Sequence, residues 1–212
     1  LTASGGPFRE WSLEQIANAT KAQALKHPNW DMGAKVTIDS ASMMNKGLEM
    51  IEASWLFNLP TEKIEIVVHP QSIIHSMVQF TDGCLKAQLG APDMRVPIQY
   101  ALSYPQRISL NTERLDFAQL KELTFYAPDK ERFPAIRLAY HAHNSGGNMA
   151  CIMNGANEAA VAAFLKEKIK FKDITDIIEK TMGKCTFVPQ PTIEDIYNTH
   201  AQALEIANSL IK

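Results

Sequence analysis

The stretch DSASMMNKGLEMIEASWLF, residues 39–57, gathers side chains that could hold an anion and a metal ion next to each other. A helix turns by about 100° per residue, so one side of it carries five polar residues: Ser42, Asn45, Lys46, Glu49 and Glu52. We expect Ser40 at the N-terminus of this helix, where free backbone N–H groups and the positive dipole end favour a phosphate or carboxylate. Lys46 adds a full charge and Asn45 a neutral donor, while Glu49 is placed to hold a cation beside the anion.

The same residues also allow a simpler interpretation. Ser40 and Ser42 would only cap the helix, and Lys46 and Glu49 would form a surface ion pair that contributes about 0.2–0.5 kcal/mol. The other side of the helix carries apolar residues at helical spacing, which predict a buried stripe made of Met44, Leu48, Ile51 and Trp55.

Two neighbouring segments could complete an anion site. The sequence SGGP, residues 4–7, predicts a turn that brings the Ser4 hydroxyl and backbone N–H groups to a second side of the anion, although a plain turn explains it equally well. The sequence HPNWDMG, residues 27–33, predicts a loop in which Trp30 and Met32 form a lid that excludes water. His27 could donate to a phosphate, or it could be an ordinary surface histidine.

The composition limits the classes of protein to which this chain can belong. The chain has 212 residues, 46% of them hydrophobic, and its 21 Lys and Arg residues against 23 Asp and Glu residues give a net charge of −2. Without a block of like charge we expect no nucleic-acid partner, and without an apolar run of about 18 residues or a signal pattern we expect no membrane partner. Three widely spaced cysteines indicate reduced thiols, as in the bacterial cytoplasm or the plastid stroma. Neither a dinucleotide-binding glycine motif nor a P-loop occurs.

The local patterns predict a sheet in the first half of the chain. Capping boxes that begin at Ser12 and Thr20 predict two short helices after the Gly-rich turn, which itself follows a strand end. Strands are predicted at residues 35–39, 63–70, 72–80 and 84–90. The last two would be joined in a hairpin through Thr81-Asp82-Gly83, which makes the sheet partly antiparallel.

The second half predicts helices. They are expected at residues 133–144, 148–166, 173–182 and 193–211, after a connector rich in proline and scattered apolar residues. The predicted class is therefore α/β: a mixed α+β catalytic domain with a four-strand, partly antiparallel sheet at residues 1–103, a linker at 104–129, and a small all-α four-helix bundle at 130–212.

Four long runs closely resemble the 1-deoxy-D-xylulose 5-phosphate reductoisomerase family. They are LTASGGPFRE, KHPNWDMGAKVTIDSASMMNKGLEMIEASWLFN, IVVHPQSIIHSMVQFTDG and AQLGAPDMRVPIQYAL. The resemblance covers the whole chain and is strongest over residues 1–103. In that family an N-terminal NADPH-binding domain precedes a catalytic domain, a linker and a C-terminal four-helix bundle. Since this chain does not begin with Met, we expect it to start partway through the catalytic domain.

The resemblance also implies roles for individual residues. Those matching the grip on the substrate phosphate are Ser4, Ser40, Asn45 and Lys46, with His27 closing over it. Trp30 and Met32 match the lid over the substrate, Gly33 matches a position against the cofactor, and Met94 resembles a residue near the nicotinamide. Glu49 matches a metal-ligating glutamate, and we take Glu49 and Lys46 as the candidate catalytic residues.

The activity that the resemblance implies is a rearrangement followed by a reduction. The family converts 1-deoxy-D-xylulose 5-phosphate to 2-C-methyl-D-erythritol 4-phosphate with NADPH and a divalent metal such as Mg²⁺, Mn²⁺ or Co²⁺, as a homodimer that we expect to form through the sheet. The family's other two metal ligands and its cofactor loop lie upstream of the residue that matches Leu1. We therefore expect this chain alone to be inactive.

Two other classes of function stay open at this point. The chain could be a self-sufficient phosphosugar isomerase or lyase, or a non-catalytic anion-binding dimerisation module. The missing starting Met and metal ligands disfavour the first, and the four quoted runs disfavour the second.

Overall fold

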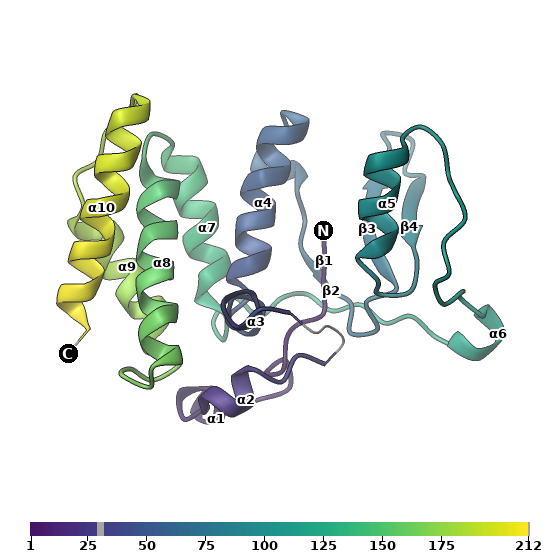
Figure 1. The fold of residues 1–212 in the computed structure, drawn as a ribbon, viewed down its shortest axis with the longest axis horizontal. Helices are drawn as coiled ribbons and strands as arrows, with labels where there is room; N and C mark the ends of the chain where they lie inside the picture. Colours follow the sequence, from purple (N-terminus) through teal and green to yellow (C-terminus); the bar gives the residue numbers. More distant parts are fainter. Residues whose placement is uncertain (29–31, 212) are drawn as a thin grey trace. The chain divides into compact units, whose positions relative to one another are not determined.

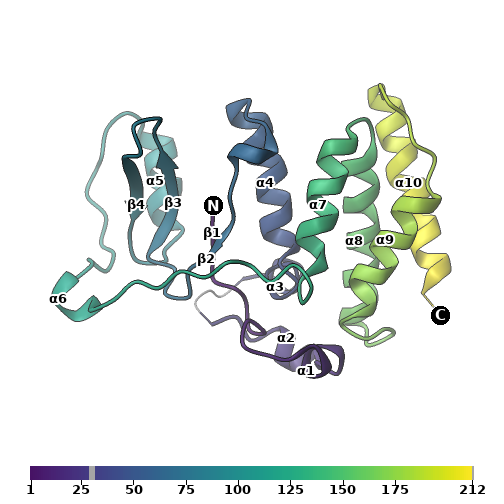
Figure 2. The same ribbon diagram turned by 180° about the vertical axis from the view of Figure 1, so that it is seen from behind.

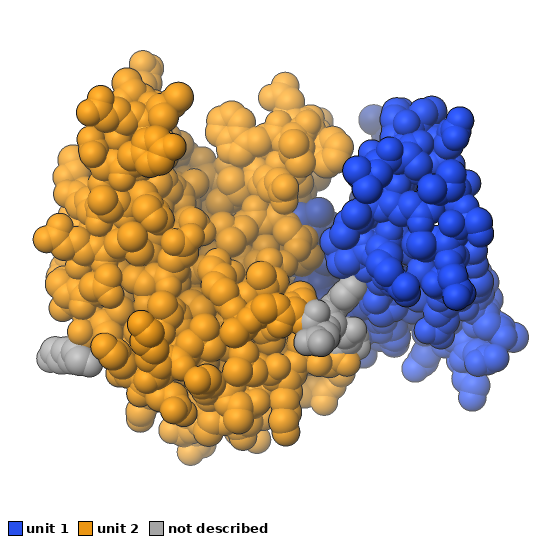
Figure 3. All heavy atoms as spheres, in the orientation of Figure 1, with its two compact units in different colours: residues 1–4, 66–127 blue, residues 5–65, 128–212 orange. Residues whose placement is uncertain are grey.

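A computed structural model describes residues 1–28 and 32–211 and divides the chain into two compact units (Figures 1 and 3). The first unit consists of residues 1–4 and 66–127, and the second of residues 5–65 and 128–212. None of the helices in the described ranges is both long and apolar enough to span a bilayer. Each unit has its own packing and is described by itself.

The first unit holds the four strands found in the described residues, together with two helices. They are β1 (Thr2–Ala3), β2 (Val67–Val68), β3 (Ile74–Gln79), β4 (Leu85–Leu89), α5 (Arg95–Ser103) and α6 (Phe117–Leu120). Strands β1 and β2 pair in parallel, and β3 and β4 pair antiparallel. The predicted hairpin is confirmed, with Gly83 at a φ of 84° in its turn. In the described part of the chain the strands therefore form two two-stranded sheets.

Other details of the predicted sheet are wrong. Of the strand expected at residues 63–70, only Val67 and Val68 are strand, and Lys63 is the last residue of a short 3-10 helix at Thr61–Lys63. Helix α5 follows Met94 in a segment where no helix was predicted. Pro97 lies within the first turn of α5, where a missing backbone N–H costs little.

A buried histidine organises the first unit. His69 is fully buried, its Nδ1 lies 2.9 Å from the Thr124 carbonyl oxygen, and its Nε2 accepts the Ile73 N–H at 3.2 Å. The Phe125 ring stacks on the imidazole at 4.7 Å between centroids. Because both ring nitrogens are used by backbone groups, this histidine is structural.

The second unit is helical. Its elements are α1 (Leu13–Ala17), α2 (Lys21–Ala24), α3 (Ala34–Ala41), α4 (Met44–Phe57), α7 (Pro134–Ser145), α8 (Met149–Leu165), α9 (Asp173–Lys184) and α10 (Ile193–Leu210). Figures 1 and 2 show α4, α7, α8 and α10 side by side. Both predicted capping boxes are confirmed, at Ser12 and Thr20. The four C-terminal helices are also confirmed, each within two residues of the expected bounds.

The strand predicted at residues 35–39 is a helix. Val36, Thr37 and Ile38 are β-branched and locally favour a strand, but α3 buries Thr37, Ile38 and Ala41. An ion pair between Lys35 and Asp39, one helical turn apart, supports the same conformation. Burial of one helical face outweighs the weak local preference here.

The helix predicted from Asp39 onward is interrupted. Met43 has a left-handed backbone with φ 64°, so α3 ends at Ala41 and α4 begins at Met44. Ser40 is consequently in the last turn of α3, and its predicted place at a helix N-terminus is wrong. The Ser42 hydroxyl accepts the Met44 N–H at 3.4 Å and so bridges the corner between the two helices.

The predicted apolar stripe of α4 is partly right. Met44 and Ile51 are buried and Leu48 is half-buried, whereas Trp55 is 76% exposed. Helix α4 instead turns Gly47 toward α7: a Cβ built on Gly47 would lie 2.6 Å from the Ala139 Cβ. Helix α4 therefore lies closer to α7 than its apolar pattern alone indicates.

We expect the substitution Gly47→Ala to destabilise the chain. Its added methyl would overlap Ala139, and overpacking of this kind costs about 1–3 kcal/mol in the free energy of unfolding. Chemical denaturation of the two proteins would measure it. The double variant Gly47→Ala/Ala139→Gly, in which the space is restored, should recover part of the loss.

Gly183→Ala is the matched control. Gly183 also lies within a helix, but a Cβ there would meet nothing within 4 Å. Because glycine is the poorer helix former, this change should leave the unfolding free energy unchanged or raise it by roughly 0.5–1 kcal/mol. Equal stability of Gly47→Ala and the unsubstituted chain would contradict the close approach of α4 and α7.

Candidate functional site

Three polar side chains cluster at the start of α4. Asn45 and Lys46 lie in its first turn and Glu49 in its second. The Asn45 amide donates to Glu49 Oε1 at 2.7 Å, and the Lys46 ammonium donates to Glu49 Oε2. The Lys46 side chain is 13% exposed and that of Glu49 is 38% exposed. One carboxylate thus faces solvent with a donor on each of its oxygens.

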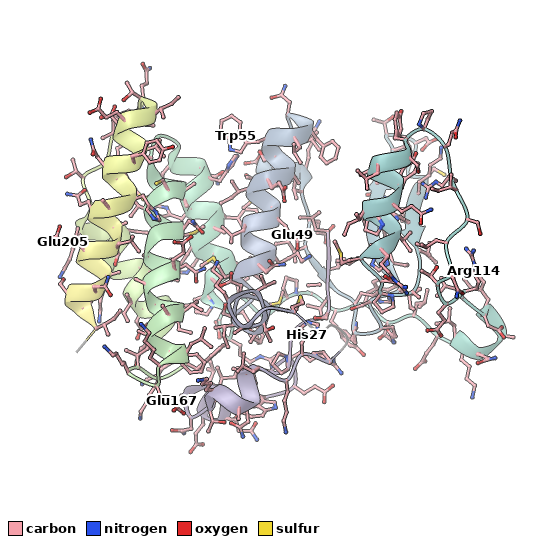
Figure 4. The ribbon with its side chains drawn as sticks, viewed as in Figure 1. His27, Glu49, Trp55, Arg114, Glu167 and Glu205 are labelled. Carbon is pink, nitrogen blue, oxygen red and sulfur yellow. The ribbon has the colours of Figure 1, made fainter. Side chains whose placement is uncertain are left out.

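The direction of this cluster follows from helix geometry. Gly47 faces α7, and Glu49 comes two residues later, about 200° further around the helix. Glu49 therefore lies on the side of α4 away from α7, and Figure 4 shows it there, with His27 near α3. The first-turn N–H groups of α4, which have no partner within a helix, lie at the same end as Asn45 and Lys46.

A second cluster lies at the end of α3. The His27 Nε2 is 3.0 Å from the Ser40 hydroxyl, which joins the predicted loop to the helix. Burial lowers the pKa of His27 from its ordinary value, so the ring is mainly neutral at neutral pH and offers one N–H. Ser40 and His27 are thereby brought together as two neutral polar side chains.

The Gly-rich turn passes close to the same place. Gly6 has a φ of 62°, and a Cβ on it would lie 2.8 Å from the Ser40 carbonyl oxygen. Only glycine permits both this backbone conformation and this approach. The close approach of the turn to the end of α3 at this point therefore depends on Gly6.

A buried carboxylate stands behind this corner. Asp39 is 2% exposed, and it accepts the Lys35 ammonium at 2.5 Å and the Asn157 amide of α8 at 3.0 Å. Burial raises the pKa of Asp39, and the nearby Glu158 charge adds to the rise, although Lys35 and Asn157 oppose it. Neither Asp39 nor Asn157 is among the candidate residues that the sequence indicated. What could have marked them is their polarity, since a carboxylate and an amide are unusual at positions of a helix that face the core.

The remaining candidate residues lie in other places. Met32 and Gly33 precede α3, where their carbonyl oxygens lie 3.3 and 3.0 Å from the Thr37 hydroxyl. Ser4 follows β1 and Met94 precedes α5, both in the first unit. Trp30 lies outside the described residues. The structure thus brings together His27 with Ser40, and Asn45 with Lys46 and Glu49.

Two protein-family models match segments of this chain. A family model described as "DXP reductoisomerase C-terminal domain" matches residues 89–206, more than half of the chain. The chain belongs to the 1-deoxy-D-xylulose 5-phosphate reductoisomerase family. A second model, "1-deoxy-D-xylulose 5-phosphate reductoisomerase C-terminal domain", matches residues 1–57, which include the α3–α4 corner.

Curated members of the reductoisomerase family align with the whole chain. A 1-deoxy-D-xylulose 5-phosphate reductoisomerase of Phocaeicola vulgatus is 62% identical over 211 residues, covering 100% of this chain and 55% of the relative. That of Acetivibrio thermocellus is 55% identical over 212 residues, covering 100% of this chain and 56% of the relative. The chain therefore spans about half the length of the curated relatives it matches.

Solved structures of the reductoisomerase family give the same result. The enzyme from Zymomonas mobilis in complex with NADPH is 49% identical with a TM-score of 0.92, and the match covers 100% of this chain and 54% of that one. A reductoisomerase crystallised with NADPH, fosmidomycin and magnesium is 43% identical with a TM-score of 0.95, at 100% and 54% coverage.

The donor set suits a hard cation only in part. The Glu49 oxygens are the ligand type that Mg²⁺ prefers, and the carboxylate is accessible. Within residues 1–28 and 32–211, however, no three His, Cys, Asp or Glu residues come together as a metal site. Glu49 therefore offers one accessible carboxylate and would need further ligands to hold a metal ion.

The raised pKa of Asp39 gives a prediction about pH. A carboxyl group whose pKa is higher in the folded protein stabilises the fold fully below its unfolded pKa, and this contribution is lost as pH rises through the folded pKa. Asp39→Asn never acquires the charge. The stability of this variant relative to the unsubstituted chain should therefore increase with pH across that window.

Urea denaturation at a series of pH values would measure the difference. The control is Asp173→Asn on α9, since the Asp173 side chain is half-exposed and receives only the Lys170 N–H. Parallel pH profiles for Asp39→Asn and the unsubstituted chain would show that burial does not raise the Asp39 pKa.

Proposed function

We propose that this chain is part of an NADPH- and divalent-metal-dependent reductoisomerase of non-mevalonate isoprenoid biosynthesis. The whole enzyme would rearrange 1-deoxy-D-xylulose 5-phosphate and reduce the product to 2-C-methyl-D-erythritol 4-phosphate. The supporting observation is the α3–α4 corner, where Ser40 lies in the last turn of α3, Asn45, Lys46 and Glu49 lie in the first two turns of α4, and His27 contacts Ser40. Membership of the reductoisomerase family supports the same substrate.

The corner is suited to the phosphate of this substrate. The first-turn N–H groups of α4 and the positive end of its dipole attract an anion, and the Lys46 ammonium adds a full charge. Ser40, Asn45 and His27 offer neutral donors, and we propose that Ser4 adds another. Phosphate bound far from the reacting carbons contributes binding energy that orients the substrate.

Glu49 would hold the metal beside the phosphate site. Its two oxygens are oriented by Asn45 and Lys46, so the carboxylate is fixed before a cation binds. A bound divalent cation would supply charge stabilisation at the substrate oxygens, and NADPH would supply the hydride. We propose that Gly33 and Met94 contact the cofactor and that Trp30 and Met32 exclude water from the site.

The finer architecture is part of the same proposal. We propose the domain bounds 1–103, 104–129 and 130–212, with a four-strand sheet and a C-terminal four-helix bundle. The Thr2 hydroxyl lies 2.7 Å from the Ile74 carbonyl oxygen, which brings β1 alongside β3 and supports a joint sheet. Homodimerisation through the β3–β4 hairpin would cover Val78 and Leu85, each 58% exposed. A cytoplasmic or plastid location accords with the reduced thiols.

The phosphate site can be tested with Lys46→Ala. Removing the ammonium deletes a charge-assisted hydrogen bond, so the affinity for 1-deoxy-D-xylulose 5-phosphate and for inorganic phosphate should fall about tenfold or more. Titration of the 15N-labelled chain by NMR would give both dissociation constants.

Lys180→Ala on α9 is the control, because it removes an exposed lysine outside the corner. Its dissociation constants should match those of the unsubstituted chain. If Lys46→Ala bound both ligands as tightly as Lys180→Ala does, Lys46 would not belong to a phosphate site.

The chain by itself should not catalyse the reaction. It offers one carboxylate to the metal at the corner and carries no glycine motif for a dinucleotide. An assay with 1-deoxy-D-xylulose 5-phosphate, NADPH and Mn²⁺ should show no NADPH oxidation above background, with the full-length Phocaeicola vulgatus relative as the positive control. Turnover by the chain alone would favour a self-sufficient phosphosugar isomerase instead.

A further inference from the structure

The buried Asp39 connects three parts of the second unit. Its carboxylate accepts from Asn157, which lies 118 residues further along the chain on α8. Its backbone carbonyl accepts the Ser42 hydroxyl at 3.3 Å, and Ser42 in turn accepts the Met44 N–H at the start of α4. The next residue, Ser40, meets His27. Asp39 therefore connects α8 both to the end of α3 and to the start of α4.

Burying Asp39 and Asn157 lowers the stability of the fold. Asn157 is fully buried, and its Oδ1 has no hydrogen-bond partner among the described residues. An unsatisfied buried acceptor costs about 1–3 kcal/mol, and burial also disfavours the Asp39 charge. Two alanines would remove both costs and leave only a small gap, and buried ion pairs are often replaced by apolar residues of similar volume without loss of stability. Stability alone does not account for the pair.

The pair does constrain rotation. Consecutive residues of a helix point about 100° apart, so fixing the Asp39 side chain against α8 also fixes the direction of Ser40. Asp39 is 2% exposed and faces the core, while Ser40 is only half-buried. Without the bond to Asn157, α3 would be held in the core by its buried residues Thr37, Ile38 and Ala41, whose apolar contacts are non-directional.

We propose that Asp39 and Asn157 are positioning residues for the anion site. Their hydrogen bond sets the rotation of α3, so that Ser40 and His27 converge with the first turn of α4 on one bound phosphate group. The inference rests on the proposed phosphate site and assigns a role in it to α8, an element that contributes none of the proposed ligands.

Inorganic phosphate titration of the chain tests the pair. Asn157→Ala should weaken phosphate binding about tenfold, the effect of losing one hydrogen bond to a charged group. The double variant Asp39→Ala/Asn157→Ala removes the buried charge as well. It should fold with a thermal midpoint at or above that of the unsubstituted chain, yet bind phosphate equally weakly. A purely structural pair would show the opposite, a lower midpoint with unchanged affinity, and that outcome would overturn the proposal.

Two further variants complete the experiment. Asn154→Ala removes an amide one turn away on α8, which bonds only to Glu158 of the same helix, so it should bind phosphate normally. Asp39→Asn/Asn157→Asp exchanges donor and acceptor and should restore affinity to within about twofold, whereas Asn157→Asp alone, with two facing carboxylates, should not. Failure of the folded exchange variant to recover affinity would contradict the positioning role.

The unsubstituted chain separates this inference from the proposed function. If it fails to bind phosphate, the anion site is wrong and the positioning role falls with it. If it binds phosphate and Lys46→Ala does not, but Asn157→Ala binds as the unsubstituted chain does, the anion site stands and the positioning role alone is wrong.

Discussion

A buried carboxylate must accept hydrogen bonds from protein donors because it has lost its water. In the second unit this carboxylate is that of Asp39, and the helices around it supply the donors. Asp39 receives Lys35 from its own helix and Asn157 from α8. These bonds are directional, unlike the apolar contacts around them, so they determine how α3 is rotated as well as where it lies. The corner between α3 and α4, with its polar side chains, inherits its geometry from that rotation.

Close packing provides the second constraint. Gly47 lets α4 approach α7 until a methyl group would no longer fit between the helices. The left-handed Met43 then turns the chain between the two helices, so that Ser40 and Lys46 end up on adjoining helix ends. Both constraints come from helices α7 and α8, which follow the corner by about a hundred residues of chain. The C-terminal helices thus contribute to the site without supplying a ligand.

The charges at the corner balance one another. Lys46 and Asn45 hold the Glu49 carboxylate, so neither the cation nor the anion is left unpaired before a ligand binds. A bound phosphate would pair with the Lys46 ammonium, and a bound metal ion would pair with the Glu49 carboxylate. This pairing of charges accords with the proposed binding of a phosphate and a metal ion at the corner.

The sequence by itself determined the features that depend on neighbouring residues. The two capping boxes, the hairpin with Gly83 and the four C-terminal helices follow from local hydrogen bonding and periodicity, and the structure has all of them. The resemblance of the quoted runs named ten candidate site residues, and the structure brings together two groups of them, His27 with Ser40 and Asn45 with Lys46 and Glu49.

Only the tertiary structure decided the features that depend on distant partners. Residues 35–39 form a helix because α3 packs against α4 and α8, although their β-branched side chains favour a strand. Trp55 is exposed because α4 turns Gly47 toward α7. The pairing of Asp39 with Asn157 spans 118 residues, and no local pattern encodes it. Such contacts arise from packing between helices, whose free energy outweighs propensities worth about 1 kcal/mol or less per residue.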